Sequence, residues 1–280
     1  DLTKNQFAPR VSLQWFPNVD TQIYTSYARG FQSPTYNAVN FFSEPDPVKQ
    51  VVVDAYELGV KSKALDGALT FDGAVFYTEQ QDVTVATVSL TSGGVVRFDN
   101  AAGSKIKGAE VTFVLTPLPD ANPGLAVTGG ASYLDTEYTN FSNGRGFDED
   151  TGLSFGETSL LPARDFTGNE MPRTPKFTYT FGVNQNVPVD SGWFEVAVDA
   201  YYNSGFYFSA QNSELFSNPY YHVFNARASY SHEPWGLQLT LFVQNFTDEE
   251  YYSSMFLDDF GSGITLNQPR SYGARLKWAF

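Results

Sequence analysis

An alternation of apolar and polar residues with a period of two constrains the fold of this chain more than any other feature of its sequence. The clearest example is KFTYTFGVN (176–184), where aromatic residues and a valine alternate with lysine, threonine and asparagine. WFEVAVDAYY (193–202) and GLQLTLFVQN (236–245) repeat the pattern. Successive side chains of a β-strand point to opposite faces, so each stretch predicts a strand with one apolar and one polar face. A helical period is nearly absent, and the chain is predicted to be all-β.

The same pattern, interrupted by turn residues, predicts about eleven antiparallel strands in total. Besides the three stretches above, strands are predicted to begin near Val11, Thr21, Val51, Ala68, Val95, Leu125, Tyr220 and Ile264. The chain ends on SYGARLKWAF (271–280), which alternates in the same way. One side of this last strand carries Tyr272, Leu276, Trp278 and Phe280, with Ala274 between them, and is predicted to face lipid.

The connections between these strands are of two kinds that alternate along the chain. Short ones, rich in the Pro, Asp, Asn and Gly of tight turns, cover 16–21, 63–68, 118–124, 187–192 and 231–236. Long ones cover roughly 31–50, 86–94, 141–172, 209–218 and 253–263. Short turns at one end and long loops at the other are typical of barrels of the bacterial outer membrane, whereas a soluble sandwich has no reason to sort its loops. The sequence therefore predicts an antiparallel transmembrane β-barrel in contact with outer-membrane lipid.

Tryptophan gives an independent indication. The chain has only four, Trp15, Trp193, Trp235 and Trp278, and each is predicted to lie close to a short turn or at the same end of the sheet. Indole rings prefer the membrane–water interface, so the four are predicted to form a periplasmic aromatic girdle. The alternative is that they are scattered core residues.

Charge and composition narrow the classes of function. The net charge of −14 argues against binding of nucleic acid, which requires a basic surface. No run of about 18 apolar residues is present, which excludes a transmembrane helix. Charged residues of the polar strand faces are predicted to line a wet lumen, because cations near the middle of a lipid face cost about 2–4 kcal/mol each. These residues are Glu57, Lys61, Asp72, Glu110, Glu195, Asp199, Arg227, Arg275 and Lys277.

Five stretches together resemble successive motifs of TonB-dependent outer-membrane receptors of the siderophore-receptor type. They are YTSYARGFQSPTYN (24–37), YELGVKSKALDGALTFDGAVFYTEQQDV (56–83), KGAEVTF (107–113), NFTDEEYY (245–252) and QPRSYGARLKWAF (268–280). The resemblance implies a 22-stranded barrel, an N-terminal plug domain and uptake of a scarce ligand, most often a ferric siderophore, driven by TonB–ExbB–ExbD. The last strand, ending on Phe280, also resembles the signal that the barrel-assembly machinery reads.

An odd set of about eleven strands cannot close as an ordinary single-chain bacterial barrel, and open edges are not tolerated in lipid. We therefore expect residues 1–280 to be the C-terminal half of the barrel, with the plug domain, its TonB box and the N-terminal strands outside this sequence.

The long loops are expected to carry ligand contacts, because arginines supply charge and donors and aromatic rings supply contact area for flat anionic chelates. The candidates are Tyr36, Phe141, Arg145, Phe147, Arg164, Phe166, Tyr207 and Phe216. The alternative for each is that it packs its own loop.

No catalytic constellation, cofactor site or metal site is predicted. The acidic runs at 148–150, 248–250 and 258–259 lack the spacing of a calcium loop. Neither His222 nor His232 has a partner at ligand spacing, so haem is not favoured. Two other functions stay open at this point: a passive porin-like channel, and a secreted all-β binding module such as an adhesin.

Overall fold

A single antiparallel sheet of eleven strands dominates the structure, a computed structural model that describes residues 6–37, 47–88, 96–156, 161–258 and 261–279. The strands follow one another in the sheet in chain order, so the topology is a meander. They are β1 (Arg10–Asn18), β2 (Thr21–Gln32), β5 (Val51–Ala64), β6 (Leu69–Val88), β7 (Val96–Leu115), β8 (Leu125–Asn140), β11 (Phe177–Val189), β12 (Gly192–Asn203), β15 (Tyr221–His232), β16 (Leu237–Gln244) and β19 (Ser271–Trp278). The predicted all-β class and strand number are confirmed.

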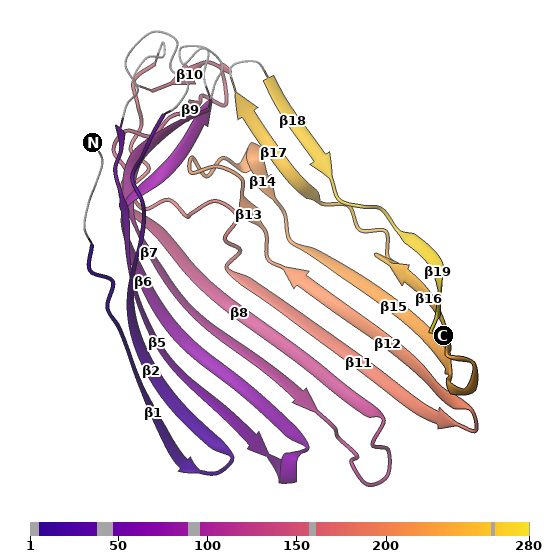
Figure 1. Cartoon of the computed structure of the whole chain (residues 1–280). Helices are drawn as coiled ribbons and strands as arrows, with labels where there is room; N and C mark the ends of the chain where they lie inside the picture. The colour runs from indigo at the N-terminus through magenta and orange to yellow at the C-terminus, as the bar shows by residue number, and fades with distance from the viewer. Residues whose placement is uncertain (1–5, 38–46, 89–95, 157–160, 259–260, 280) are drawn as a thin grey trace.

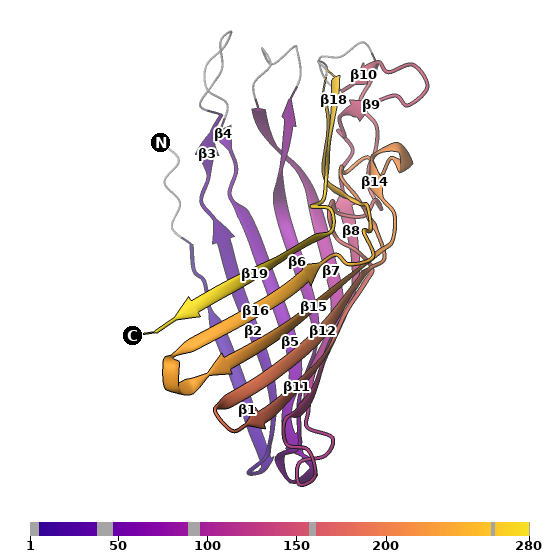
Figure 2. The same ribbon diagram turned by 90° about the vertical axis from the view of Figure 1, so that its right-hand side faces the viewer.

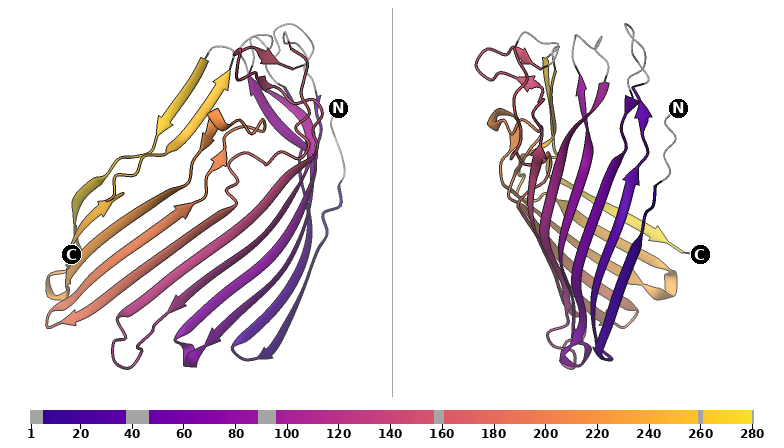
Figure 3. Two further views of the ribbon diagram at one scale, coloured as in Figure 1. Left: turned by 180° about the vertical axis from the view of Figure 1, so that it is seen from behind. Right: turned by 90° about the vertical axis from the view of Figure 1, so that its left-hand side faces the viewer.

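The sheet is curved like part of a cylinder wall. All its strands tilt in the same sense (Figure 1), and β16 and β19 cross in front of β1 and β2 when the molecule is turned (Figure 2). Short turns gather at one end of the sheet and long connections at the other (Figure 3), as the sequence predicts. No helix in the described ranges is long and apolar enough to cross a membrane.

The long connections contain small hairpins of their own. These are β3 (Thr35–Tyr36) with β4 (Pro47–Val48), β9 (Gly146–Phe147) with β10 (Ser154–Phe155), β13 (Phe206–Tyr207) with β14 (Ser217–Asn218), and β17 (Tyr252–Asp258) with β18 (Gly261–Leu266). Three-residue 3-10 turns lie at η1 (Leu65–Gly67), η3 (Glu214–Phe216) and η4 (Glu233–Trp235).

One predicted strand is wrong. Ile264 lies in β18, which pairs with β17 in a separate hairpin, and the eleventh strand of the main sheet begins at Ser271. Asn267 still donates its backbone N–H to the carbonyl of Tyr251, but Pro269 follows and has no N–H to donate to a ladder. The alternating pattern of the sequence therefore continues from β18 into β19, and only the strand pairing shows that the two belong to different sheets.

The strand register separates a polar face from an apolar face. Directly opposed residues point to the same side, and Lys61 opposes Asp72, while Leu239 opposes Leu276. All nine charged residues predicted to line the lumen share the polar face. On that face Ser104, Thr136 and Ser229 are buried, whereas most large exposed hydrophobic side chains of the strands lie on the apolar face. Curvature brings side chains together on the concave side, so the polar face lines the inside of the curve.

Large rings on the polar face lie over glycines of the neighbouring strand. Phe76 is directly opposite Gly108, and a Cβ atom added to Gly108 would lie 2.3 Å from Cζ of Phe76. Tyr24 over Gly59 repeats this arrangement. A glycine opposite an aromatic residue lets the ring lie flat on the sheet and keeps the strand pairing intact.

Candidate functional site

A row of aromatic rings crosses the apolar face near the loop end of the sheet. Tyr27, Tyr56 and Tyr77 follow one another on β2, β5 and β6, with ring centroids 5.0 and 6.3 Å apart. Farther along the sheet, the ring of Tyr202 lies 5.0 Å from that of Tyr179 and 4.8 Å from that of His222. We call this row the upper belt. The sequence reasoning missed it, although apolar-face aromatics at the loop ends of the strands were a usable signal.

The lower belt contains three of the four tryptophans. Trp15 and Trp278 lie on the apolar face and are 63% and 66% exposed. Trp235 lies in η4, and its ring centroid is 4.3 Å from that of His232 on the apolar face. The prediction for Trp193 is wrong, because this residue opposes Ser231 and shares the polar face with Glu195. It is at the short-turn end, as predicted, but it points to the other side.

The distance between the belts fits a bilayer. His222 lies in the upper belt and His232 in the lower belt, ten residues apart along β15. Ten residues of extended strand span about 33 Å, which is about 25 Å along the membrane normal at the usual tilt of barrel strands. This equals the height of the apolar band of outer-membrane barrels, about 25 Å.

Charged residues on the apolar face begin at the level of the upper belt, where Lys107 is directly opposite Tyr77. Arg29 donates two hydrogen bonds of 2.8 Å to Asp54, directly above Tyr27 and Tyr56. Between the belts, the described strand residues of the apolar face include no Asp, Glu, Lys or Arg. Tyr272 and Leu276 on β19 belong to this face and are 83% and 69% exposed. Phe280 lies outside the described residues.

The long connection between β8 and β11, residues 141–176, contains a small aromatic core. Phe141, Phe155 and Phe166 are 3%, 1% and 4% exposed, and their rings meet edge to face at centroid distances of 5.2 and 6.0 Å. Tyr138 and Ala210 complete this cluster. The prediction that Phe141 and Phe166 contact ligand is wrong for this structure, because both rings are used to pack the loop.

Arg164 packs against the aromatic core. Its guanidinium carbon lies 4.3 Å from the ring centre of Phe155, and one of its nitrogens lies 2.5 Å from a carboxylate oxygen of Asp148. A hydrogen bond from Thr151, together with Arg164, lowers the pKa of Asp148 to about 2. The charge of Arg164 is therefore already neutralised within the loop.

The other predicted ligand residues are scattered over the loops. Tyr36 is the most exposed of them, at 43%. Arg145 is half-buried, with Cγ 2.8 Å from the place that a Cβ on Gly156 would take. The structure does not gather the eight candidates into one cluster: Phe147 and Phe216 are also half-buried, and Tyr207 donates its hydroxyl hydrogen to Glu214 at 2.9 Å.

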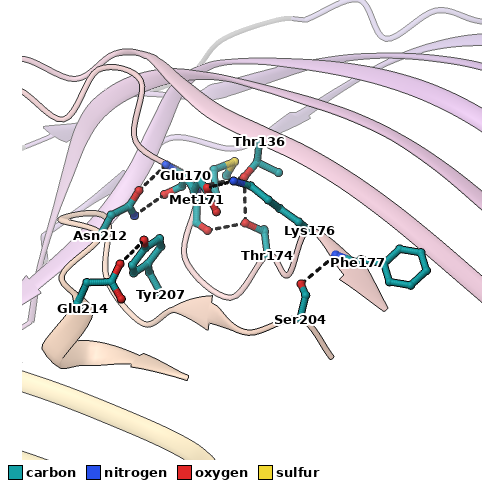
Figure 4. Close-up of polar contacts among 10 residues, drawn as sticks. All are labelled: Thr136, Glu170, Met171, Thr174, Lys176, Phe177, Ser204, Tyr207, Asn212 and Glu214. Atoms are coloured by element: carbon teal, nitrogen blue, oxygen red, sulfur yellow. Dashed lines mark hydrogen bonds and ion pairs between the residues drawn. The ribbon is translucent and has the colours of Figure 1, made fainter. Parts of the chain in front are cut away.

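The connection between β12 and β15, residues 204–220, is tied to the 141–176 loop by polar contacts (Figure 4). Asn212 accepts a hydrogen bond of 2.6 Å from the backbone N–H of Glu170 and donates one of 2.9 Å to the carbonyl of the same residue. The carboxylate of Glu170 lies 2.6 Å from Nζ of Lys176, and this contact raises the pKa of Lys176. The side-chain amide of Asn212 thus makes the two hydrogen bonds that the backbone of a neighbouring strand would otherwise make.

The same two-point contact recurs around the loop end of the sheet. The side chain of Asn37 bonds both backbone groups of Phe98 at 2.8 Å, which ties the β2–β5 connection to β7. Asn100 bonds the backbone of Lys49 in the same way. We call such a contact an amide clamp. Nothing in the sequence marks these asparagines, because their partners are backbone groups of distant segments.

No group of three or more His, Asp or Glu side chains in the described residues could hold a metal ion. The candidate functional surfaces of the structure are the membrane-facing wall, the polar concave face and the set of ordered loops described above.

Comparison with known proteins agrees with this arrangement. A curated relative, the probable TonB-dependent siderophore receptor PiuA of Acinetobacter baumannii, is 25% identical over 257 residues, which is 88% of this chain and 30% of that protein. The crystal structure of the ferric yersiniabactin uptake receptor FyuA from Yersinia pestis superposes with a TM-score of 0.76 at 18% identity, covering 98% of this chain and 37% of FyuA. The PiuA crystal structure gives a TM-score of 0.67 at 24% identity, with 96% and 35% covered.

The chain thus spans about a third of the length of the relatives it matches. Residues 1–246 match the family model described as TonB dependent receptor-like, beta-barrel. Since this match covers most of the sequence, the chain belongs to the TonB-dependent receptor family, in its β-barrel domain.

Proposed function

We propose that this chain forms the C-terminal half of a 22-stranded barrel whose full-length protein takes up a ferric siderophore with energy from TonB–ExbB–ExbD. Members of the family are outer-membrane β-barrels of Gram-negative bacteria and transport receptors rather than enzymes, so the chain is an outer-membrane protein. The plug that would contact TonB, and the remaining strands, belong to the part of the proposed protein beyond these 280 residues.

The observation that carries the proposal is the combination of the family match with an open, curved sheet. The two edge strands β1 and β19 have no partner on their outer sides among the described residues. Exposed backbone N–H and C=O groups are costly in lipid, so the sheet requires further strands to close it. Eleven more strands would give the 22-stranded size, whose lumen is wide enough to hold a plug.

Each surface of the chain has a part in this function. The belts and the apolar face would hold the wall in the membrane, and the polar face would line the path of the ligand. The apolar-face side chains Tyr272, Leu276 and Trp278 on β19 are proposed to be recognised by the barrel-assembly machinery, together with the C-terminal phenylalanine. The ordered loops would meet the ligand outside.

The test is uptake by intact cells that express the full-length protein. Growth under iron limitation and uptake of iron-55 supplied as ferric siderophores are compared in the wild type, a deletion strain and a TonB-deficient strain. Uptake that requires both the protein and TonB supports the proposal. Ion conductance in planar bilayers without TonB-dependent iron uptake would contradict it and indicate a passive channel.

A further inference from the structure

The connection 204–220 holds its two neighbouring loops through three amide clamps, and each clamp uses both backbone groups of one residue. Gln211 accepts from the N–H of Phe147 at 3.1 Å and donates to its carbonyl at 2.8 Å. Asn218 accepts from the N–H of Tyr252 at 3.2 Å and donates to its carbonyl at 2.8 Å. With the clamp from Asn212 described above, this one connection has two clamps to the 141–176 loop and one to the β17–β18 hairpin.

Other contacts support the same assembly. Asn169, in the 141–176 loop, donates hydrogen bonds to the connection 204–220, at the carbonyls of Ala210 (2.8 Å) and Gln211 (3.2 Å). Ala210 is itself part of the aromatic core of the 141–176 loop. Asn218 is only 2% exposed, so its clamp is shielded from competing water.

We propose that Gln211, Asn212 and Asn218 are positioning residues that hold three external loops as one pre-formed body before a ligand arrives. A buried backbone group that loses its hydrogen-bond partner pays a desolvation cost. Opening a clamp would leave both the N–H and the C=O of the clamped residue without their partner, and this cost resists opening. An incoming ligand would then meet a fixed surface and would not have to order these loops. The proposal rests on the proposed function only in naming that surface as the ligand's.

The conformation of Asn212 shows why its replacement needs care. Its φ is +56°, in the left-handed region that asparagine and glycine adopt more readily than other residues. Asn212→Ala would add backbone strain to the loss of the clamp. Asn212→Gly removes the side chain without that strain and is the better variant.

Hydrogen exchange of the full-length, ligand-free receptor tests the proposal directly. The reporters are the amides of Phe147, Glu170 and Tyr252, one for each clamp. All three are expected to be protected without ligand, and Gln211→Ala, Asn212→Gly and Asn218→Ala are each expected to speed exchange at their own reporter roughly 10- to 100-fold. Fast exchange of the three amides in the wild type would overturn the proposal.

Gln211→Glu separates a positioning role from a general effect on folding. A carboxylate can accept from the N–H of Phe147 but cannot donate to its carbonyl. Protection of that amide should therefore be partly kept in the Glu variant and lost in the Ala variant. Equal loss in both would contradict the role given to the two-point clamp.

A matched control is available at the opposite end of the sheet. Asn122 and Gln185 bond each other through both amides at 2.8 and 2.9 Å, next to a short turn. Asn122→Ala removes a similar pair of hydrogen bonds and should leave all three loop reporters unchanged.

The joint movement of the loops is measured with spin labels at Leu153 and Leu215, which are 42% and 61% exposed and lie in different loops. The chain has no cysteine, so engineered pairs in it can be labelled without competition from its own residues. A narrow distance distribution is expected without ligand, and a broad one in the triple variant Gln211→Ala, Asn212→Gly, Asn218→Ala. A broad distribution in the wild type would refute the single body. Neither readout depends on iron uptake, so failure here and failure of the proposed function are distinguishable.

Discussion

Phe155→Ala is expected to loosen the 141–176 loop and to leave the barrel sheet intact. Phe155 is 1% exposed, and its ring meets that of Phe166 at 6.0 Å and the guanidinium of Arg164 at 4.3 Å. These contacts lie within the loop and its aromatic core. Removal of the ring therefore acts on local opening of the loop and not on global unfolding.

The magnitude follows from burial. Truncation of a buried phenylalanine to alanine usually costs 3–5 kcal/mol. An external loop can collapse partly into the cavity, so we take the lower value, about 3 kcal/mol, which includes the lost cation–π contact. This corresponds to roughly a 150-fold increase in the opening equilibrium.

The assay is hydrogen exchange of the full-length receptor. The loop reporters are the amide of Gly144, which donates to the carbonyl of Arg164 at 2.8 Å, and that of Phe166, which donates to the carbonyl of Phe141 at 2.8 Å. Leu153→Ala is the matched control: Leu153 lies two residues from Phe155 but is 42% exposed. Its effect should be within about threefold.

Two results would refute this reasoning. One is acceleration of less than about fivefold at both loop reporters in Phe155→Ala. The other is equal acceleration in the strands of the sheet, which would mean that the loop core supports the whole barrel.

Three further predictions concern charge, lipid and strand pairing. The pKa of Asp148 in the folded protein is lowered to about 2. Its stabilisation of the loop is therefore complete above about pH 4, the ordinary carboxyl pKa, and is lost as the pH falls toward 2. Pepsin cleavage of the loop should rise as the pH falls over this range, and should rise less in Asp148→Asn. Leu241→Arg places a cation midway between the belts and should cost about 2–4 kcal/mol in bilayer refolding. Thr112→Arg on the polar face, directly opposite Asp72, should cost little; equal costs would contradict the face assignment. Gly108→Ala should destabilise the barrel by about 1–3 kcal/mol in guanidinium unfolding, since its Cβ would overlap a ring, while Gly30→Ala, with no atom within 4 Å of the new Cβ, should change little.

The sequence alone was sufficient for the features that depend on neighbouring residues. Alternation depends on the fixed two-residue period of a strand, so the apolar and polar faces could be assigned without any pairing. Turn residues mark their own positions, so the sorting of short and long connections was also predictable. Trp15 and Trp278 lie on the apolar face because their side chains follow the parity of β1 and β19.

Features that depend on distant segments required the tertiary structure. The strand at Ile264 was assigned to the main sheet, but its partner, Met255, lies in the β17–β18 hairpin. Exposure of loop aromatics depends on which rings meet, and Phe141, Phe155 and Phe166 meet only because the loop folds back on itself.

The amide clamps show this limit most clearly. Asn212 recognises the backbone of Glu170, and any residue type supplies the same N–H and C=O groups. A partner of this kind leaves no signature in the sequence. The local pattern therefore determined a curved wall with two faces, and the meeting of separate loops in space decided how its outer end is held together.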